Sequence, residues 1–493
     1  MRMARKTFLG IQGVLLNAIL LAGFGLAADV DYFADNGFDN SLATMQHPCA
    51  EYYNGKTYIA YQGPHEDAYV CVYDHQAKKW QGPVLAGVSP MGNAADPTSR
   101  GEADNHGRPA LIVDGQGYVH LIFGGHGGQP SLGKNLFGAP GKGKQTHVVT
   151  TRAEDISTWK ILDNVDPFGT YSQFVKMDDG DIYLFYRHGS HWSDWVYQKS
   201  TDNCRTFAQP VSILKHKTQK ADANVHDSWY AWFAKGKGAT IVGMYVYHPC
   251  LAVGHTSRRS NTYYMKMNCG DESWENVSGR TLSVPVTKEH ADEMTLVYNS
   301  GTARCNHGIC AVDDSGAPHL FFRYDKGQVR YTRWLGDAWQ EPRPMSADAG
   351  SRDGDMIVES PTEVRLLLSG AKQGGGGEAC WWSTKDGGKT WSKEGCVISS
   401  NTVSYNLGAF VRNFNSEGQV VIEERDPASP NLYRKMFLWG SKGLVGRSAE
   451  EAAQMAEHLK NMVAAQPHDE QDRADRAKRA ARKRAKKAAA NDE

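Results

Sequence analysis

One phrase recurs along the chain: a polar turn that contains glycine, followed by a strand in which aromatic and β-branched residues alternate with other residues. This alternation has the period of a β-strand, and the turn before it indicates a hairpin. The phrase returns about every 50 to 80 residues, which is long enough for about four short strands, as in one propeller blade. The sequence therefore predicts an all-β fold, a seven-bladed β-propeller. The seven instances are YYNGKTYIAYQG at Tyr52, VDGQGYVHLIFGG at Val113, MDDGDIYLFYRHG at Met177, AKGKGATIVGMYV at Ala234, VDDSGAPHLFFRYD at Val312, SPTEVRLLLSG at Ser360 and NSEGQVVIEER at Asn415.

A second repeat supports this fold. TKDGGKTW, Thr384–Trp391, fits the Asp-box (BNR) pattern Ser/Thr-x-Asp-x-Gly-x-Thr-Trp/Phe, and STDNCRTF, Ser200–Phe207, is a degenerate copy with Cys204 in place of glycine. In such a turn the aspartate satisfies backbone N–H groups while the aromatic ring packs between strands. The motif indicates a fold and says almost nothing about chemistry.

The two ends of the chain differ from its core. Three basic residues precede an apolar run from Thr7 to Leu26, and small residues follow, so residues 1–28 are predicted to be a secretory signal peptide of a secreted or periplasmic protein, with an uncleaved anchor as the alternative. Residues 29–442 form the predicted propeller. Residues 443–493 are rich in Ala, Lys and Arg and begin with a capping box, Ser448 and Glu451, which predicts a charged helical or disordered tail. A basic tail could bind an acidic polymer, but a solvated helix is the more common explanation.

Nine cysteines are an odd number for an exported protein. Cys380 and Cys396 flank a strand-turn-strand segment and could form a disulfide across it. Two other pairs are open alternatives, Cys305 with Cys310 and Cys49 with Cys71.

Four residues at strand ends of neighbouring blades are candidates for catalysis. His106 precedes and His126 follows one strand in DNHGRPALIVDGQGYVHLIFGGHG, while Tyr171 precedes and Arg187 follows the strand of the next blade. His120, in the middle of its strand, is predicted to pack in the wall. Ligands bind to propellers where the strand-end loops converge, so the four side chains are expected to meet there.

These residue types suit a β-elimination better than a hydrolysis. A uronate linked through O4 is cleaved when a base removes H5 and an acid protonates the departing O4. The C5 proton becomes acidic enough only when a cation or strong donors neutralise the carboxylate, as arginine does with two hydrogen bonds. Imidazole and phenol groups supply the base and the acid.

The pattern DNHG…GGH, followed by Tyr171 and Arg187, resembles the propeller ulvan lyases of polysaccharide lyase families twenty-four and twenty-five. This resemblance implies an exported polysaccharide lyase that cleaves ulvan, an anionic sulfated rhamnose–uronate polymer, to a 4,5-unsaturated uronate. It also implies that Tyr171 and His106 transfer protons while Arg187 and His126 neutralise the carboxylate, with the assignment of the two histidines open. Asn105, His191 and Trp192 are candidates for sugar contacts, the last two within the aromatic segment HWSDW.

A structural zinc or other divalent ion is also expected, because the resembling lyases are expected to hold one with similar ligands. Two thiolates and two imidazoles make a plausible tetrahedral set, and the candidates are His248, Cys250, Cys269 and His307. Cys305 or Cys310 could replace one of them, and a disulfide with two unrelated histidines is the alternative. No organic cofactor is expected.

Other activities fit parts of the pattern. A sialidase would need an arginine near the start of the mature chain, but none occurs between Asp29 and Arg100. A rhamnose–glucuronate lyase or a rhamnosidase acting on arabinogalactan, and a carbohydrate-binding propeller without catalysis, are the remaining alternatives. We expect a monomer with no nucleic-acid partner and no membrane span after signal cleavage. The sequence does not distinguish glucuronate from iduronate, or endo from exo cleavage.

Overall fold

The computed structural model describes residues 28–91, 104–126, 131–138, 141–142, 144–189, 191–218, 226–250, 258–325, 327–346, 353–426, 428 and 432–465. The predicted signal peptide, apart from Ala28, and the basic end of the tail lie outside these residues. Among the described residues, no helix is both long enough and apolar enough to span a membrane.

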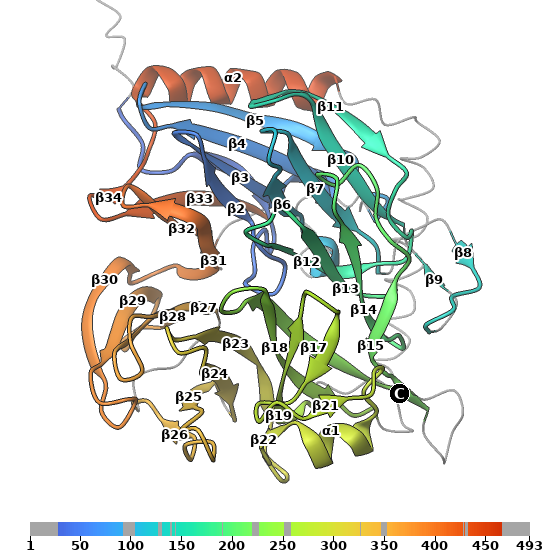
Figure 1. Cartoon of the computed structure of the whole chain (residues 1–493). Coiled ribbons are helices and arrows are strands. Elements are labelled where there is room, and N and C mark those ends of the chain that lie inside the picture. Colours follow the sequence, from blue (N-terminus) through green and yellow to red (C-terminus); the bar gives the residue numbers. More distant parts are fainter. Residues whose placement is uncertain are drawn as a thin grey trace, which may run out of the picture.

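The chain forms an all-β fold with a propeller-like arrangement of sheets, and its described part contains two α-helices (Figure 1). Four of the sheets have four strands each, in meandering antiparallel order. They consist of β6 (Ala110–Val113), β7 (Val119–Gly124), β10 (Gln145–Arg152) and β11 (Asp155–Leu162); β12 (Thr170–Lys176), β13 (Ile182–Arg187), β14 (Trp195–Ser200) and β15 (Val211–Leu214); β23 (Cys305–Val312), β24 (Pro318–Tyr324), β25 (Gln328–Arg333) and β26 (Arg343–Pro344); and β27 (Gly354–Val358), β28 (Val364–Ala371), β29 (Gly377–Thr384) and β30 (Ser392–Ser400).

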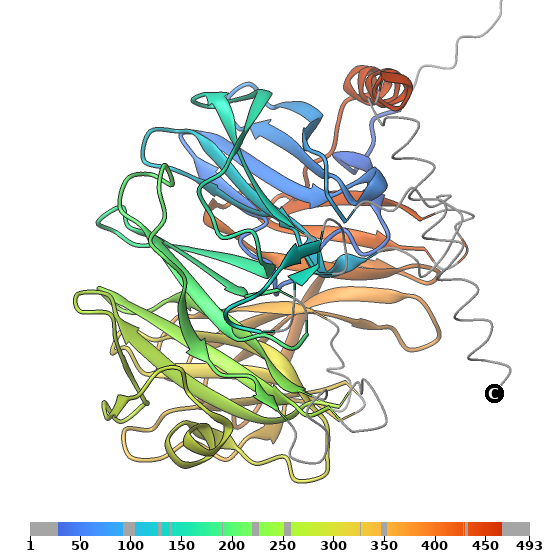
Figure 2. The same ribbon diagram turned by 90° about the vertical axis from the view of Figure 1, so that its right-hand side faces the viewer.

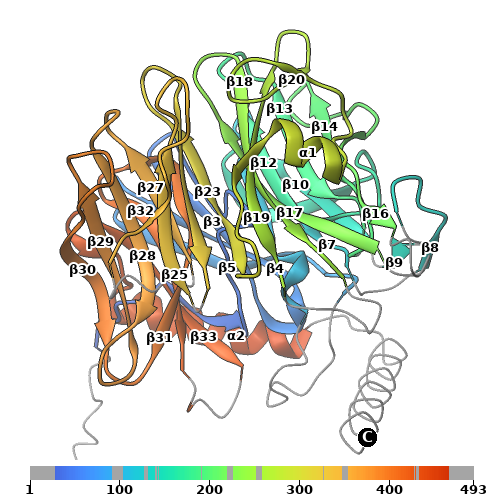
Figure 3. The same ribbon diagram turned by 90° about the horizontal axis from the view of Figure 1, so that it is seen from below.

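Two larger sheets complete the ring. The seven-stranded sheet contains β16 (Lys217–Thr218), β17 (His226–Lys235), β18 (Thr240–His248), β19 (Ser260–Asn268), β20 (Ser273–Glu275), β21 (Thr281–Leu282) and β22 (Leu296–Tyr298). The nine-stranded sheet contains β1 (Ala34–Phe38), β2 (Ala50–Tyr53), β3 (Lys56–Gln62), β4 (Ala68–Asp74), β5 (Lys79–Gly87), β31 (Ser404–Asn415), β32 (Gly418–Arg425), β33 (Tyr433–Gly440) and β34 (Gly443–Leu444). A small hairpin pairs β8 (Ser131–Gly133) with β9 (Gly141–Lys142). Figure 3 shows β29 and β30 on the opposite side of the molecule from β13 and β14.

All seven predicted hairpins are confirmed. Each predicted turn joins two antiparallel neighbours, namely β2 and β3, β6 and β7, β12 and β13, β17 and β18, β23 and β24, β27 and β28, and β31 and β32, although the turn between β27 and β28 contains no glycine. The sequence did not predict helix α1 (Lys288–Met294), because seven residues are too few to show a helical period.

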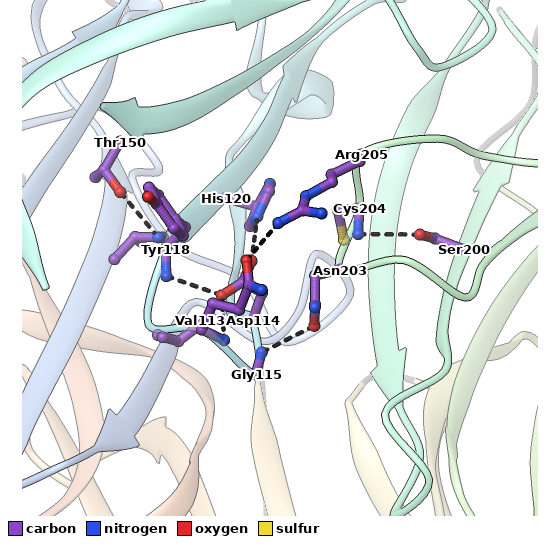
Figure 4. A network of polar contacts seen from close by, with 12 residues as sticks. Val113, Asp114, Gly115, Tyr118, His120, Thr150, Ser200, Asn203, Cys204 and Arg205 are labelled. Atoms are coloured by element: carbon purple, nitrogen blue, oxygen red, sulfur yellow. Dashed lines mark hydrogen bonds and ion pairs between the residues drawn. The ribbon is translucent and has the colours of Figure 1, made fainter. Parts of the chain in front are cut away.

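The turn between β6 and β7 shows how one aspartate shapes such a hairpin (Figure 4). Oδ1 of Asp114 accepts hydrogen bonds from the backbone N–H groups of Gln116 and Tyr118. Oδ2 of Asp114 lies 3.4 Å from Nε2 of His120, whose Nδ1 lies 3.0 Å from Nε2 of His147. His120 is only 3% exposed. It therefore packs within the wall, as predicted, and takes no part in the site.

The Asp-box turns have the geometry that their sequences predict. Oδ1 of Asp386 accepts from the backbone N–H groups of Lys389 and Thr390, and the Thr384 hydroxyl accepts from that of Gly388. In the degenerate copy Ser200 accepts from the N–H of Cys204, which adopts the positive φ of 58° that glycine would favour. Cys204 is buried, so its side chain fills space while its backbone makes the turn.

The two ends of the fold meet in one sheet. Strand β1 pairs with β33, and Val30 forms an isolated bridge with Arg447, so the blue and red ends of the ribbon lie together (Figure 2). Helix α2 (Ala449–Ala465) begins with the predicted capping box, in which the Ser448 and Glu451 side chains bond to each other's N–H groups. The Glu451 carboxylate also accepts from the N–H of Trp80, which fixes the helix on β5.

One predicted disulfide is present, and two are not. Cys380 and Cys396 are bonded across the paired strands β29 and β30. Cys305 and Cys310, and likewise Cys49 and Cys71, are buried thiols and form no disulfide. Cys305 contacts the hydroxyl of Thr262, and Cys310 lies on the same strand, β23.

Candidate active site

His106 and His126 share one carboxylate. Their Nδ1–H groups donate to the two oxygens of Asp104, to Oδ1 from His106 and to Oδ2 from His126 at 2.7 Å. Because a carboxylate only accepts hydrogen bonds, Nδ1 of each ring carries a proton, and the neutral His106 ring has the lone pair of a base on Nε2. The rings stack with centroids 3.7 Å apart and planes 11° apart.

Backbone geometry brings the two histidines together. His106 lies in the short 3-10 helix Asn105–Gly107, which Asp104 caps by accepting from the His106 N–H. His126 follows β7 and has a φ of +55°. The preceding Gly125 also has a positive φ, and a Cβ on it would come within 1.7 Å of the carbonyl oxygen of Gly169. The Gly124–Gly125 pair therefore lets this loop touch the start of the next sheet, which carries Tyr171.

Tyr171 has a strained backbone and faces the histidines. Its φ is +60°, and the register of β12 against β13 shifts between Thr170 and Gln173. Such a bulge re-aims a side chain, and strain of this kind is concentrated at functional sites. The Tyr171 ring lies 5.5 Å from the His106 ring, centroid to centroid, edge to face.

Arg187, at the end of β13, is buried with unused donors. Its exposed fraction is 1%, and its Nε and Nη1 atoms have no hydrogen-bond partner within the described part of the chain. The guanidinium carbon lies 4.9 Å from the Tyr171 ring centroid and 5.6 Å from that of Tyr230. A buried cation without a partner destabilises a fold, so these donors indicate a group that accepts an anionic ligand.

Tyr230, on β17, forms a second phenol beside the first. Its ring centroid is 5.4 Å from that of Tyr171, and the two side chains share a hydrogen bond. Burial raises the pKa of Tyr171 well above 10, and neighbouring Tyr230 raises it further. Burial would also raise the pKa of Tyr230, but the guanidinium groups of Arg259 and Arg187 outweigh it and hold that pKa below 10. Tyr171 therefore stays protonated, and Tyr230 is the more acidic of the two phenols.

A cavity of about 390 Å³ opens beside the two phenols. Its lining carries four arginines and one aspartate, together with His307: Arg108, Arg259, Arg323, Arg425 and Asp353. This excess of positive charge favours an anionic ligand.

The arrangement combines a neutral imidazole base, a protonated phenol and a buried guanidinium with unsatisfied donors. Burial lowers the pKa of His106 to about 4, so its ring is neutral at neutral pH. Burial alone would raise the pKa of Asp104, but hydrogen bonds from both histidines hold it well below 3.8, so the carboxylate stays charged. These groups can remove a carbon-bound proton next to a carboxylate and protonate a leaving oxygen.

Residues 56–345 match the family described as "BNR repeat-containing family member". A curated ulvan lyase from Nonlabens ulvanivorans is 42% identical over 440 residues, which cover 86% of this chain and 92% of that protein. The chain belongs to the ulvan lyase family. Its members are polysaccharide lyases, and two solved ulvan lyase structures of family PL25 share 41% identity and a TM-score of 0.81, with 87% of this chain and 99% of each relative covered. One of these two relatives is bound to -[GlcA(1-4)Rha3S]-.

In this ulvan lyase family member, the predicted sugar-binding residues take different places. Asn105 is held by the protein itself, since its amide donates to Asp39 and its oxygen accepts from Gln62. Trp192 is 40% exposed and available at the surface. His191 instead lies against His248, with Nε2 of His191 2.8 Å from Nδ1 of His248.

The predicted metal set is brought together only in part. Cys250 Sγ lies 3.4 Å from Nε2 of His191, so His191, His248 and Cys250 form one cluster. Cys269 is wrong as a member: β18 and β19 are antiparallel, and Cys269 follows the opposite end, roughly 25 Å away at the rise of a strand. His307 is also wrong, because it lines the cavity among arginines, which would repel a metal cation.

Several site residues were not predicted from the sequence. Asp104 stands two residues before His106, and its carboxylate could have been recognised as the partner that orients an imidazole. Tyr230 lies within the strand sequence WYAWF, where an aromatic residue is expected in the core. Arg259 follows another arginine in a polar loop, and no feature of the sequence there indicates a site residue.

Proposed function

We propose that this lyase acts on ulvan and breaks the 4-linked uronate bond by β-elimination, releasing a 4,5-unsaturated uronate. The observation that carries the proposal is Arg187, a buried guanidinium with two unsatisfied donors beside the hydroxyl-bearing ring of Tyr171. A carboxylate bound to those donors would stabilise the charge that develops when H5 leaves. The names of the relatives support the choice of polymer.

In the proposed reaction, Arg187 binds the uronate carboxylate, and His126 donates to it in the state in which both of its ring nitrogens carry a proton. Nε2 of His106 takes H5, and the electrons of the C5–H bond form the C4=C5 double bond. The C4–O4 bond breaks, and the Tyr171 hydroxyl gives its proton to the departing O4. Tyr230 then returns a proton to Tyr171 through their shared hydrogen bond, and the cycle closes when His106 releases its proton to solvent and Tyr230 regains one. Glucuronate and iduronate present H5 on opposite faces, so the two epimers require the base on opposite sides of the sugar ring.

The variant Tyr171→Phe tests this assignment. With ulvan as substrate, the ultraviolet absorbance of the conjugated unsaturated product should rise with the wild-type enzyme and stay flat with the variant, while retention of ulvan persists. Tyr58→Phe is the matched control, because the buried hydroxyl of Tyr58 has no hydrogen-bond partner among the described residues and lies in another sheet. A Tyr171→Phe enzyme that retains wild-type turnover would refute the assignment of the acid.

The sheets are proposed to be seven blades. Four are the four-stranded sheets, and a fifth is the β17–β20 part of the seven-stranded sheet. The nine-stranded sheet is interpreted as two blades, one formed by β2–β5 and the other by β31–β33 with β1. The support is that β2 and β31 are joined only by a single parallel pair, Glu51 with Arg412.

A structural zinc or other divalent ion is proposed at His191, His248 and Cys250. Two imidazole nitrogens and one sulfur within 4.8 Å of one another, with His248 and Cys250 buried, fit the donor types that zinc prefers. Bound there, the ion would tie the loop after β13 to the end of β18. Metal analysis should find about one equivalent in the wild type and Cys269→Ser, and loss in His248→Ala together with a lower melting temperature.

Export through the N-terminal signal, a monomeric state and a solvated basic tail complete the proposal. The composition of residues 1–28 and 443–493 supports the first and the last. Mass spectrometry of the mature protein and gel filtration would test export and the monomer directly.

A further inference from the structure

Across the cavity from the phenols, one sheet contributes a histidine and an arginine that the proposed elimination does not use. His307 lies on β23 and Arg323 on the adjacent strand β24. The register of the two strands shifts between Cys305 and Gly308, so His307 sits in a bulge. A Cβ at Gly308 would come within 1.8 Å of the Phe321 carbonyl oxygen, so the glycine permits this close pairing.

The hydrogen bonding fixes the tautomer of His307. Arg323 can only donate, and its Nη2 lies 3.3 Å from Nε2 of His307. Nε2 therefore accepts, and the ring proton is on Nδ1. Nδ1 is buried and has no partner within the described residues. His307 thus has an unused N–H donor and lines a cavity of positive charge.

The surroundings favour an anion at this donor. Burial, followed by the positive charges of Arg323, Arg259 and Arg108, holds the pKa of His307 well below 6.5, so the ring is a neutral donor. Arg108 and Arg259 line the same cavity, and Asp353 is its one acidic lining residue among those described. An anion there would receive a hydrogen bond from Nδ1 and the attraction of several guanidinium groups.

We infer that His307 and Arg323 form a sulfate subsite, which binds the sulfate ester of a sugar next to the uronate that is cleaved. The inference rests on the proposed function. Arg187 lies beside Tyr171 but does not line this cavity, and its unsatisfied donors already provide for the uronate carboxylate, so the cationic groups of the cavity are available for a second anion. A tetrahedral sulfate offers several acceptor oxygens to donors that converge from two strands. In the ligand named for one PL25 relative, the rhamnose next to glucuronate carries a sulfate.

The test compares ulvan with chemically desulfated ulvan for the wild type and for Arg323→Gln. The wild type should prefer the sulfated polymer, and the variant should lose about 10- to 100-fold in kcat/KM on ulvan, the effect of one charge-assisted hydrogen bond. On desulfated ulvan the two enzymes should agree within about threefold. His307→Asn should reduce the preference for sulfated over desulfated ulvan by a smaller factor. This second variant tests the subsite if Arg323→Gln does not fold.

Arg333→Gln is the matched control, because Arg333 lies on β25 of the same sheet and outside this cavity. Equal losses on both polymers, or a wild type indifferent to sulfate, would overturn the subsite. Retention of the two polymers in affinity electrophoresis gives a readout that does not depend on elimination. If no absorbance rises with either polymer, the proposed function has failed, and the retention difference between wild type and Arg323→Gln then decides the subsite alone.

Discussion

The imidazole rings of His106 and His126 lie face to face, with their centroids 3.7 Å apart, and each is hydrogen-bonded to a different carboxylate oxygen of Asp104. One carboxylate thereby fixes the tautomer of both rings. It also holds their Nε2 atoms on the same side, because each ring is anchored through Nδ1.

Asp104→Asn should lower kcat on ulvan by about a hundredfold or more while KM changes little, since an amide no longer imposes the Nδ1–H tautomer on both rings. Steady-state kinetics, followed by product absorbance, measure kcat and KM separately. Asp114→Asn is the control, because Asp114 holds a buried histidine of the wall in the same sheet. A loss confined to KM would show that Asp104 serves binding only.

The pH profile of kcat/KM should reflect the protonation of His106. The base must be neutral, and burial lowers its pKa from 6.5 to about 4. Activity should therefore persist below pH 6.5 and fall as the pH approaches about 4. Between these values the unfolded chain binds a proton at this residue that the folded chain does not, so stability should also decline with falling pH. An acid limb centred at pH 6.5 would contradict this.

Arg187→Met should abolish elimination without lowering the melting temperature. The guanidinium is buried with two unsatisfied donors, so replacing it with an apolar side chain of similar length removes an unfavourable term in the free energy of folding. Calorimetry and the absorbance assay measure the two effects separately. A melting temperature that drops by several degrees would mean that the fold needs this cation.

Gly125→Ala should be far more damaging than Gly55→Ala. Both glycines have positive φ, but a Cβ at Gly55 meets nothing within 4 Å, whereas at Gly125 it would meet the Gly169 carbonyl oxygen. Gly55→Ala should cost about 1 kcal/mol of unfolding free energy. Gly125→Ala should cost more and should also reduce activity, because it separates His126 from the sheet of Tyr171. Equal costs would indicate that only the backbone angle matters.

Glu423→Gln should flatten the dependence of stability on pH. Burial raises the pKa of Glu423 from 4.5 to about 7, so between these values the folded state holds a proton that the unfolded state has released. Stability from this group falls as pH rises through that window. The variant should therefore gain most over wild type above pH 7 in denaturant titrations, and a constant difference at all pH values would contradict the explanation.

Sequence patterns predicted the hairpins, and the proximity of four candidate side chains, because both depend on local order. A glycine turn and its strand lie within one short segment, and strand ends gather on one rim of a propeller-like fold. His106, His126, Tyr171 and Arg187 therefore met as expected, and Asp104 could have been found from its place beside His106.

The errors concern contacts between strands that are distant in sequence. Cys269 was grouped with His248 by proximity along the chain, but a nine-residue antiparallel strand separates them. His307 has the right ligand atoms for a metal, and only the arginines around it in the folded state show otherwise. Tyr230 resembles a core residue until Arg187 and Arg259 are seen beside it.

Because β33 is the one strand with which β1 pairs among the described residues, the first strand of the fold has no partner until the last part of the chain is made. The sheet that holds β1 therefore cannot be completed before β33 has been synthesised, so its closure is a late event in folding. Once closed, neither end can fray without breaking a sheet that both ends share. A circular permutant opened at the exposed turn near Gly238 would separate β33 from β1 by only β34, helix α2 and the joined termini, and it should fold faster than the natural order.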